Sequence, residues 1–215
     1  MSAAPAEATR TVAGFHLLPF RAPRWRRGLQ LYAGLALFGV GMAFAVEADL
    51  GVSPWTVFHE GVADRTGTSI GTITVLTGLA ILGILRVLHE PLGLGTISNA
   101  LVVGPSLDLT LWVIPDIDAT APRVLLLAIA PVTVGLASGL YLGAGCGPGP
   151  RDGVMTAMGR RGVATWSART VIELSALTIG WLLGGTVGIG TAWTALAVGP
   201  FVHLFLERIP PIEDG

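Results

Sequence analysis

The chain has 215 residues, of which 52% are hydrophobic and 13% are charged, and its formal net charge is −1. Soluble domains carry about a quarter charged residues, so this composition excludes an ordinary soluble domain and indicates an integral membrane protein. The near-neutral charge gives no reason to expect nucleic acid as a partner, and the single cysteine, Cys146, excludes an internal disulfide.

The N-terminal segment, 1–27, is rich in alanine and arginine and ends in RAPRWRR, and we expect it to be a disordered, basic, cytoplasmic segment. No small-residue cleavage site follows its arginines, so the next apolar run reads as a retained membrane span rather than a signal peptide. The predicted spans are 28–46, 70–88, 96–114, 122–143, 167–184 and 191–207. Each is long enough to cross most of a hydrocarbon core of about 30 Å.

Two further segments, 54–65 and 150–161, begin at a proline directly after a glycine-containing break. Proline suits the first position of a helix, but a helix of this length covers only about 18 Å. We therefore predict two short re-entrant helices, which enter the membrane and leave it on the same side.

The chain contains an internal repeat. GLGTISNALVVGPSLDLTL at 93–111 matches GIGTAWTALAVGPFVHLFL at 188–206 in its glycines, threonine and Gly-Pro step. Upstream, the Gly-x-x-Pro step at 51–54 recurs at 147–150. Similarity at a fixed offset over so many positions indicates two copies of one structural unit.

The repeat defines the organisation of the chain as membrane repeat 1 (28–115), membrane repeat 2 (121–208) and a C-terminal tail (209–215). The predicted fold class is all-α, a polytopic membrane protein with six spans and two re-entrant helices. Three spans per repeat is an odd number, so the second copy is inverted, and both termini are cytoplasmic. A rival count treats the short segments as spans and gives eight spans in parallel repeats; the arginine distribution favours six.

The two breaks are the strongest functional signal. Broken helices at corresponding positions of two repeats are typical of midplane binding sites in secondary transporters, because unpaired backbone is tolerated there only beside protein or trapped water. In the second break, GAGCGPGPRDG, the cation and the acid lie at a helix N-terminus, which binds anions and carboxylates. The candidate substrate-binding residues are Arg151, Asp152, Trp55, Thr56, Gly147, Gly149 and Asn99.

Plainer interpretations exist for several polar residues. Asp152 could only stabilise the start of its helix, and Trp55 could be an interfacial anchor. His59 and Glu60 lie near an expected interface, where solvation explains them.

Four charged or titratable residues inside the predicted spans are candidates for ion or proton coupling, because such groups are costly in a membrane. Arg169 and Glu173 are spaced i, i+4, which predicts an intrahelical ion pair and makes Glu173 the best candidate for a truly buried carboxylate, as a structural partner of Arg169 or a coupling-ion site. Asp108 and His203 hold equivalent positions in the two repeats and could carry a proton if their helices met. Alternatively, each lies at a membrane interface.

The segments DLGVSPWTVFHEG and GLYLGAGCGPGPRDGVMTAM and the paired G-x-G-T…G-P segments resemble the bacterial YczE-type membrane proteins, relatives of the YitT group. The resemblance covers nearly all of 28–208. It implies a polytopic protein of the bacterial cytoplasmic (inner) membrane. It implies no substrate, activity or catalytic residue.

These observations predict a secondary transporter or exporter of a small, anionic or carboxylate-bearing solute, with its site between the two breaks. The alternative is a non-transporting accessory or scaffold protein whose breaks only let helices pack closely. The sequence has no nucleophile–base set, metal-ligand spacing or nucleotide fingerprint, so we expect no enzyme, no metal and no cofactor. The expected partners are the lipid bilayer and the solute; association as a homodimer is left open.

Overall fold

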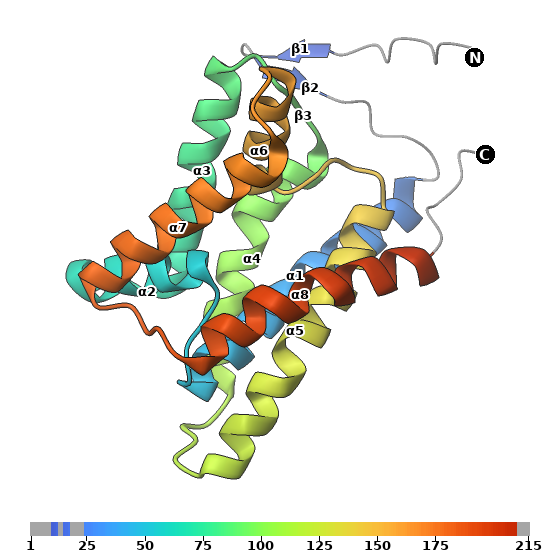
Figure 1. Ribbon diagram of the computed structural model, residues 1–215. Helices are drawn as coiled ribbons and strands as arrows, with labels where there is room; N and C mark the ends of the chain where they lie inside the picture. Colours follow the sequence, from blue (N-terminus) through green and yellow to red (C-terminus); the bar gives the residue numbers. More distant parts are fainter. Residues whose placement is uncertain (1–9, 13–14, 18–23, 210–215) are drawn as a thin grey trace.

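The computed structural model describes residues 10–12, 15–17 and 24–209, and α-helices dominate it (Figure 1). The helices are α1 (Arg24–Ala48), α2 (Pro54–Thr66), α3 (Ile70–Val87), α4 (Leu94–Val113), α5 (Thr120–Gly143), α6 (Pro150–Arg160), α7 (Thr165–Leu183) and α8 (Ile189–Arg208). The predicted all-helical architecture is confirmed. The helices could be predicted because each apolar run ends at glycine or proline. The largest difference from a predicted boundary is at α1, which begins at Arg24, inside the segment expected to precede the first span.

Four helices are long and apolar enough to cross a membrane: Trp25–Ala48, Ile70–Val87, Thr120–Gly143 and Ile189–Arg208. Helices α4 and α7 have 20 and 19 residues but fall outside this group. They nevertheless expose large apolar side chains, such as Leu101 on α4 and Leu174 on α7. Apolar side chains on the outer face of a helix are suited to lipid rather than to water. The protein is a membrane protein.

The two short helices begin at their prolines, as predicted. Helix α2 has 13 residues and α6 has 11. The start of α2 is capped by Ser53, whose Oγ accepts a hydrogen bond from the backbone N–H of Thr56 at 3.4 Å. Gly149 at the start of α6 has no side chain to do the same. The first N–H groups of α6 are therefore available to a ligand or to water.

Helices α1 and α5 form the most extensive helix–helix interface at the centre of the molecule. Helix α4 packs on α1 and α8 on α5, while α2 contacts α7 and α3 contacts α6. Small residues permit close approach of the helices: a Cβ at Gly34 would lie 2.7 Å from the backbone nitrogen of Tyr141. A buried cluster beside this contact comprises Leu31, Leu35, Val103, Tyr141, Ala144 and Cys146.

The loop between α1 and α2 interlocks with the start of α8. Gly51 has a φ of 102°, in the left-handed region that favours glycine. The backbone N–H of Gly190 donates to the carbonyl of Leu50 at 2.8 Å. A Cβ at Gly188 would overlap that same carbonyl, so two backbones touch here.

The loop between α5 and α6 interlocks with the start of α4 in the same way. Gly147 has a φ of 105°, and the backbone N–H of Gly95 donates to the carbonyl of Cys146 at 2.7 Å. A Cβ at Gly93 would overlap the carbonyl of Cys146. Each break is thus fixed by a helix start from the opposite half of the chain.

Helix α3 packs along α4, whereas α7 diverges from α8 (Figure 1). Between α3 and α4, a Cβ at Gly104 would overlap the carbonyl of Gly71, and one at Gly78 would lie 2.8 Å from the Cβ of Ala100. Helices α7 and α8 have no comparable interface, and a Cβ at Gly199 on α8 would meet nothing within 4 Å. The described chain therefore has a close α3–α4 interface and no comparable α7–α8 interface.

A small sheet corrects the expectation of disorder for part of the N-terminal segment. Strand β1 (Arg10–Val12) pairs antiparallel with β2 (Phe15–Leu17), and β2 pairs parallel with β3 (Pro91–Leu92). The physical reason is that the extended backbone after α3 offers hydrogen-bonding groups with which a distant segment can pair. Strands of two or three residues have no hydrophobic periodicity from which they could be predicted. The rest of 1–23 and the tail from 210 onward lie outside the described residues.

Glu90, just after α3, ties this connection to the end of α6. Its buried carboxylate accepts hydrogen bonds from Arg160 and, at 2.9 Å, from Arg161. Arg161 also donates to the carbonyl of Leu88 at 2.7 Å. Burial by itself raises the pKa of Glu90, but the hydrogen bonds and charges of the two arginines outweigh burial and hold the pKa below its ordinary value.

We expect the substitution Glu90→Gln to lower the free energy of unfolding at neutral pH by about 1–2 kcal/mol, because charged hydrogen bonds to two arginines are lost. The depressed pKa means that Glu90 contributes its stability above the pKa of the unfolded chain. That contribution disappears as the pH falls through the folded-state pKa. Denaturant unfolding in detergent should therefore show a gap between the two proteins at neutral pH that closes in acid; a pH-independent gap would contradict this assignment.

Candidate functional site

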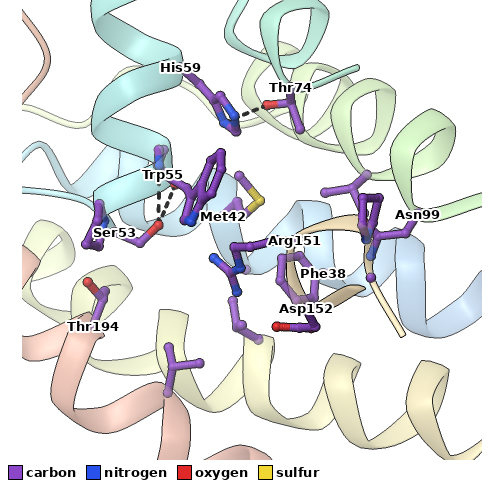
Figure 2. A pocket seen from close by; sticks show the side chains of 18 of the residues that line it. Phe38, Met42, Ser53, Trp55, His59, Thr74, Asn99, Arg151, Asp152 and Thr194 are labelled. Carbon is purple, nitrogen blue, oxygen red and sulfur yellow. Dashed lines mark hydrogen bonds between the residues drawn. The ribbon is translucent and has the colours of Figure 1, made fainter. Parts of the chain in front are cut away.

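A cavity of about 160 Å³ lies where the two helix breaks face each other, enclosed by side chains from α1 to α8 (Figure 2). Most of the predicted site residues line it: Arg151, Asp152, Trp55, Thr56, Gly149, Asn99, Arg169 and Glu173. Residues more than 90 positions apart in the sequence are brought together because α2 and α6 start on opposite sides of the same space. Apolar side chains, including Phe38 and Met42, form much of the remaining wall.

On the α6 side, polar groups converge on Gly149. A Cβ at this glycine would lie 3.4 Å from the hydroxyl of Tyr141, 3.5 Å from Nδ2 of Asn99 and 3.6 Å from Oδ2 of Asp152. Glycine here leaves room for these three groups and for the uncapped start of α6 to face the cavity. Tyr141 was not among the sequence-predicted residues, because a tyrosine inside an apolar span carries no distinctive pattern.

Arg151 and Asp152 are both half-buried in the cavity wall. Within the described part of the chain, neither side chain has a hydrogen-bond or ion-pair partner, and they do not pair with each other. Charges in a confined space of low polarity are costly unless they are matched by a partner. The cavity therefore holds one unmatched cation and one unmatched anion.

On the α2 side, two buried nitrogen atoms lack a partner: Nε1 of Trp55 and Nε2 of His59. The ring centroids of the two residues lie 6.3 Å apart (Figure 2). The other nitrogen of His59, Nδ1, is 3.1 Å from the hydroxyl oxygen of Thr74. Buried polar atoms are almost always hydrogen-bonded, so two unpaired ones at one cavity point to an absent partner.

The position of His59 and Glu60 corrects the expectation that both are solvated at an interface. Both residues are buried. His59 faces the cavity, and Oε2 of Glu60 accepts a hydrogen bond from the backbone N–H of Thr186 at 2.9 Å. The reason is that α2 lies under α7 and the 184–188 loop, so its polar side chains point into protein.

The predicted ion pair on α7 is present: Nε of Arg169 lies 3.1 Å from Oε1 of Glu173. Both residues line the cavity from the side where α7 diverges from α8. The side chain of Glu173 is 25% exposed. Glu173 is therefore not truly buried, whereas Glu60 and Glu90 are each only 7% exposed.

Asp108 and His203, which could share a proton only if their helices met, do not lie together. Asp108 binds α3: Oδ2 accepts from the hydroxyl of Ser69 at 2.6 Å and Oδ1 accepts from the backbone N–H of Gly71 at 2.8 Å. The side chain of His203 is 75% exposed, with Nδ1 3.3 Å from Glu207 on the same helix. The two residues stay apart because α4 and α8 pack on α1 and α5 rather than on each other.

Gly147 lies behind the cavity rather than in its wall. A Cβ at this position would lie 2.9 Å from Cα of Gly93 and 2.9 Å from Oγ1 of Thr96. Its role is the close packing of the break against α4. The neighbouring Cys146 is buried in the core, and its thiol donates to the carbonyl of Ala144 at 3.4 Å.

The described residues contain no group of three or more His, Cys, Asp or Glu side chains arranged to hold a metal ion. The polar side chains around the cavity include the guanidinium of Arg151, the indole of Trp55, the imidazole of His59, the amide of Asn99 and the carboxylate of Asp152. Together they offer both hydrogen-bond donors and acceptors to a polar or charged organic group.

Comparison with known proteins gives a family but no activity. A model described as "Family of unknown function (DUF6198)" matches residues 25–207. A Haemophilus influenzae uncharacterized protein is 34% identical over 85% of each chain. The Bacillus subtilis uncharacterized membrane protein YczE is 28% identical over 82% of this chain and 84% of its own, which confirms the YczE-type resemblance. No solved structure matches the chain.

Proposed function

The chain belongs to the DUF6198 family of unknown function, and from that premise we propose that it is a secondary transporter or exporter of a small solute in the bacterial inner membrane. The solute binds in the cavity between the two helix breaks. Six spans (α1, α3, α4, α5, α7 and α8) cross the membrane, α2 and α6 are re-entrant, and both termini are cytoplasmic.

Matching features of α1–α4 and α5–α8 support an inverted repeat, which is part of this proposal. Gly51 and Gly147 adopt nearly the same φ, 102° and 105°, in corresponding loops. The two helix starts that interlock with these loops, at Gly93 and Gly188, also correspond in sequence. Inverted repeats that place broken helices around a central site are the usual framework of alternating access.

The observation that supports transport, rather than binding alone, is that α3 packs closely on α4 whereas α7 does not pack closely on α8. Gly104 is in tight contact with Gly71 on α3, whereas a Cβ at its repeat counterpart Gly199 would meet nothing within 4 Å, and α8 has no comparable interface with α7. In an inverted repeat, exchanging these two arrangements closes one side of the cavity and opens the other. With the proposed topology, the α7–α8 opening faces the cytoplasm.

A solute-independent labelling experiment tests alternating access. The native thiol is removed by Cys146→Ser, and Thr77→Cys, a near-isosteric change in the cavity wall, provides a single reporter. A membrane-impermeant maleimide is applied to intact cells and to inverted membrane vesicles. We expect the reporter to react from both sides, and more slowly from the periplasmic side, where α3 and α4 are closed.

Two exposed threonines give matched controls: Thr156→Cys on α6 should react only from the cytoplasmic side and Thr68→Cys only from the periplasmic side. These controls also test the proposed orientation. A reporter at Thr77 that reacts from one side only, under all conditions, would contradict alternating access. The scaffold alternative would then explain the breaks as sites of close helix packing.

A further inference from the structure

The cavity has polar groups that the fold leaves unmatched, and they define a complementary ligand. Arg151 and Asp152 lack an ion-pair partner among the described residues, and the buried Nε1 of Trp55 and Nε2 of His59 lack a hydrogen bond. His59 is 6% exposed, so water on the outer surface does not compensate it. A ligand of the right chemistry would satisfy all four.

The hydrogen-bonding role of His59 follows from its neighbour Thr74. The single hydroxyl hydrogen of Thr74 goes to the carbonyl of Ile70, at 2.9 Å, within the same helix. Towards His59, the Thr74 oxygen must therefore accept, so Nδ1 of His59 carries the proton in the 3.1 Å contact. In the neutral ring Nε2 is then an acceptor, and it requires a donor from the cavity.

Two of the four unmatched groups are hydrogen-bond donors and two are hydrogen-bond acceptors. Arg151 and the indole N–H of Trp55 are donors that need an acceptor, and the guanidinium in addition needs a negative charge. Asp152 and Nε2 of His59 are acceptors that need a donor, and the carboxylate in addition needs a positive charge. A simple carboxylate ligand would accept hydrogen bonds from Arg151 and Trp55, but it would leave the charge of Asp152 uncompensated.

We propose that the cavity binds a zwitterion, an α-amino acid with an apolar side chain. Its carboxylate accepts hydrogen bonds from Arg151, from the indole N–H of Trp55 and from the uncapped start of α6, and its ammonium group donates to Asp152 and to Nε2 of His59. The site and the ligand are then each neutral overall, which avoids carrying a net charge into the membrane. The substrate class rests on the proposed transport function of the same site.

Size and polarity of the cavity agree with this class. A cavity of about 150 Å³ in another protein holds a benzene molecule, and this one has about 160 Å³. Leucine-sized molecules are of this order. Phe38, Met42, Ile81 and Val134 supply an apolar wall for the side chain, as small-molecule sites generally combine an apolar lining with a few polar anchors.

Equilibrium binding to the full-length protein in lipid nanodiscs tests the proposal, with radiolabelled leucine, valine, methionine and phenylalanine as probes. For the amino acid that binds best among them, two analogues separate its charges. The 2-hydroxy acid replaces the ammonium group by a hydroxyl, and the decarboxylated amine lacks the carboxylate. We expect each analogue to compete at least tenfold more weakly than its parent amino acid.

Variants assign the two ends of the ligand. Arg151→Gln and Asp152→Asn should each weaken binding at least tenfold, and Trp55→Phe, which removes only the N–H donor, by a few-fold. The exposed Arg26→Gln is the charge-matched control and should leave binding unchanged. Binding that is insensitive to Asp152→Asn, or a hydroxy acid that competes as well as the amino acid, would overturn the zwitterion assignment.

Failure of this inference is distinguishable from failure of transport. If none of the four amino acids binds while the Thr77→Cys reporter reacts from both sides, the substrate class is wrong and alternating access stands. If an amino acid binds with the expected dependence on Arg151 and Asp152 while the reporter reacts from one side only, the site is real and transport is wrong.

Discussion

The substitution Gly93→Ala is expected to remove most of the stably folded protein. The φ of Gly93 is −87°, which alanine adopts freely, so the backbone conformation itself imposes no cost. The added Cβ would, however, overlap the carbonyl oxygen of Cys146. Overpacking costs about 1–3 kcal/mol where side chains can yield, and here the obstacle is backbone held by a hydrogen bond, so we expect about 3 kcal/mol or more.

Thermal unfolding in detergent, followed by circular dichroism, measures this effect. Gly83→Ala on α3 is the matched control, because a Cβ there would meet nothing within 4 Å. It should leave stability unchanged or raise it by about 0.5–1 kcal/mol, since alanine favours helix. Gly188→Ala should behave like Gly93→Ala, because it meets the carbonyl of Leu50 in the corresponding loop. If Gly93→Ala unfolded at nearly the same temperature as Gly83→Ala, the α5–α6 loop would not be tightly packed against the start of α4.

The helices and the surroundings of the cavity were predictable from sequence because both depend on strong local signals. Glycine and proline end apolar runs with little ambiguity, and Pro54 and Pro150 mark the first residues of α2 and α6. Arg151 and Asp152 stood out because charges are rare in such a composition. The structure brings the starts of α2 and α6, which follow the two breaks, to one cavity.

His59 and Tyr141 were beyond sequence reasoning, for different reasons. Beside Glu60, His59 looks like part of a polar surface, and only the tertiary packing of α2, which places His59 beside Thr74 of α3, buries it. In the sequence, Tyr141 cannot be distinguished from the apolar residues of its span. Only the structure shows that its hydroxyl lies beside Gly149 together with the polar groups of Asn99 and Asp152. Tertiary packing places both residues at the cavity, and no local sequence pattern predicts that packing.

Asp108 and His203 show the limit of arguing from a repeat. Equivalent positions in two copies are related by symmetry, but symmetry alone does not bring them into contact. Here α4 packs on α1 and α8 packs on α5, and α4 and α8 share no comparable interface. The same comparison is informative in another way, because Asp108 is bound to α3 whereas His203 has no contact with α7 among its described hydrogen bonds and ion pairs.

This difference leads to the second large effect: Asp108→Asn should open the α3–α4 side of the cavity. The carboxylate holds the start of α3 through Ser69 and Gly71, at 2.6 and 2.8 Å. Hydrogen bonds to a charged group contribute about 1.5–3 kcal/mol each, and about 1.4 kcal/mol corresponds to a tenfold change in an equilibrium. Asparagine retains one acceptor, so we expect the Thr77→Cys reporter to react on the order of 10-fold faster from the periplasmic side.

His203→Gln is the control for this variant. The side chain of His203 is exposed, and its ion-pair partner among the described residues is Glu207 on its own helix, so the change should not alter the labelling rate from either side. Thr68→Cys and Thr156→Cys distinguish opening from unfolding, because an unfolded or leaky preparation would lose their one-sided labelling. An unchanged periplasmic rate in Asp108→Asn would mean that the α3–α4 contact does not limit access. An increase confined to Asp108→Asn would make the carboxylate a latch that holds one half closed while the other is open, which is the physical requirement for moving a solute without forming a continuous pore.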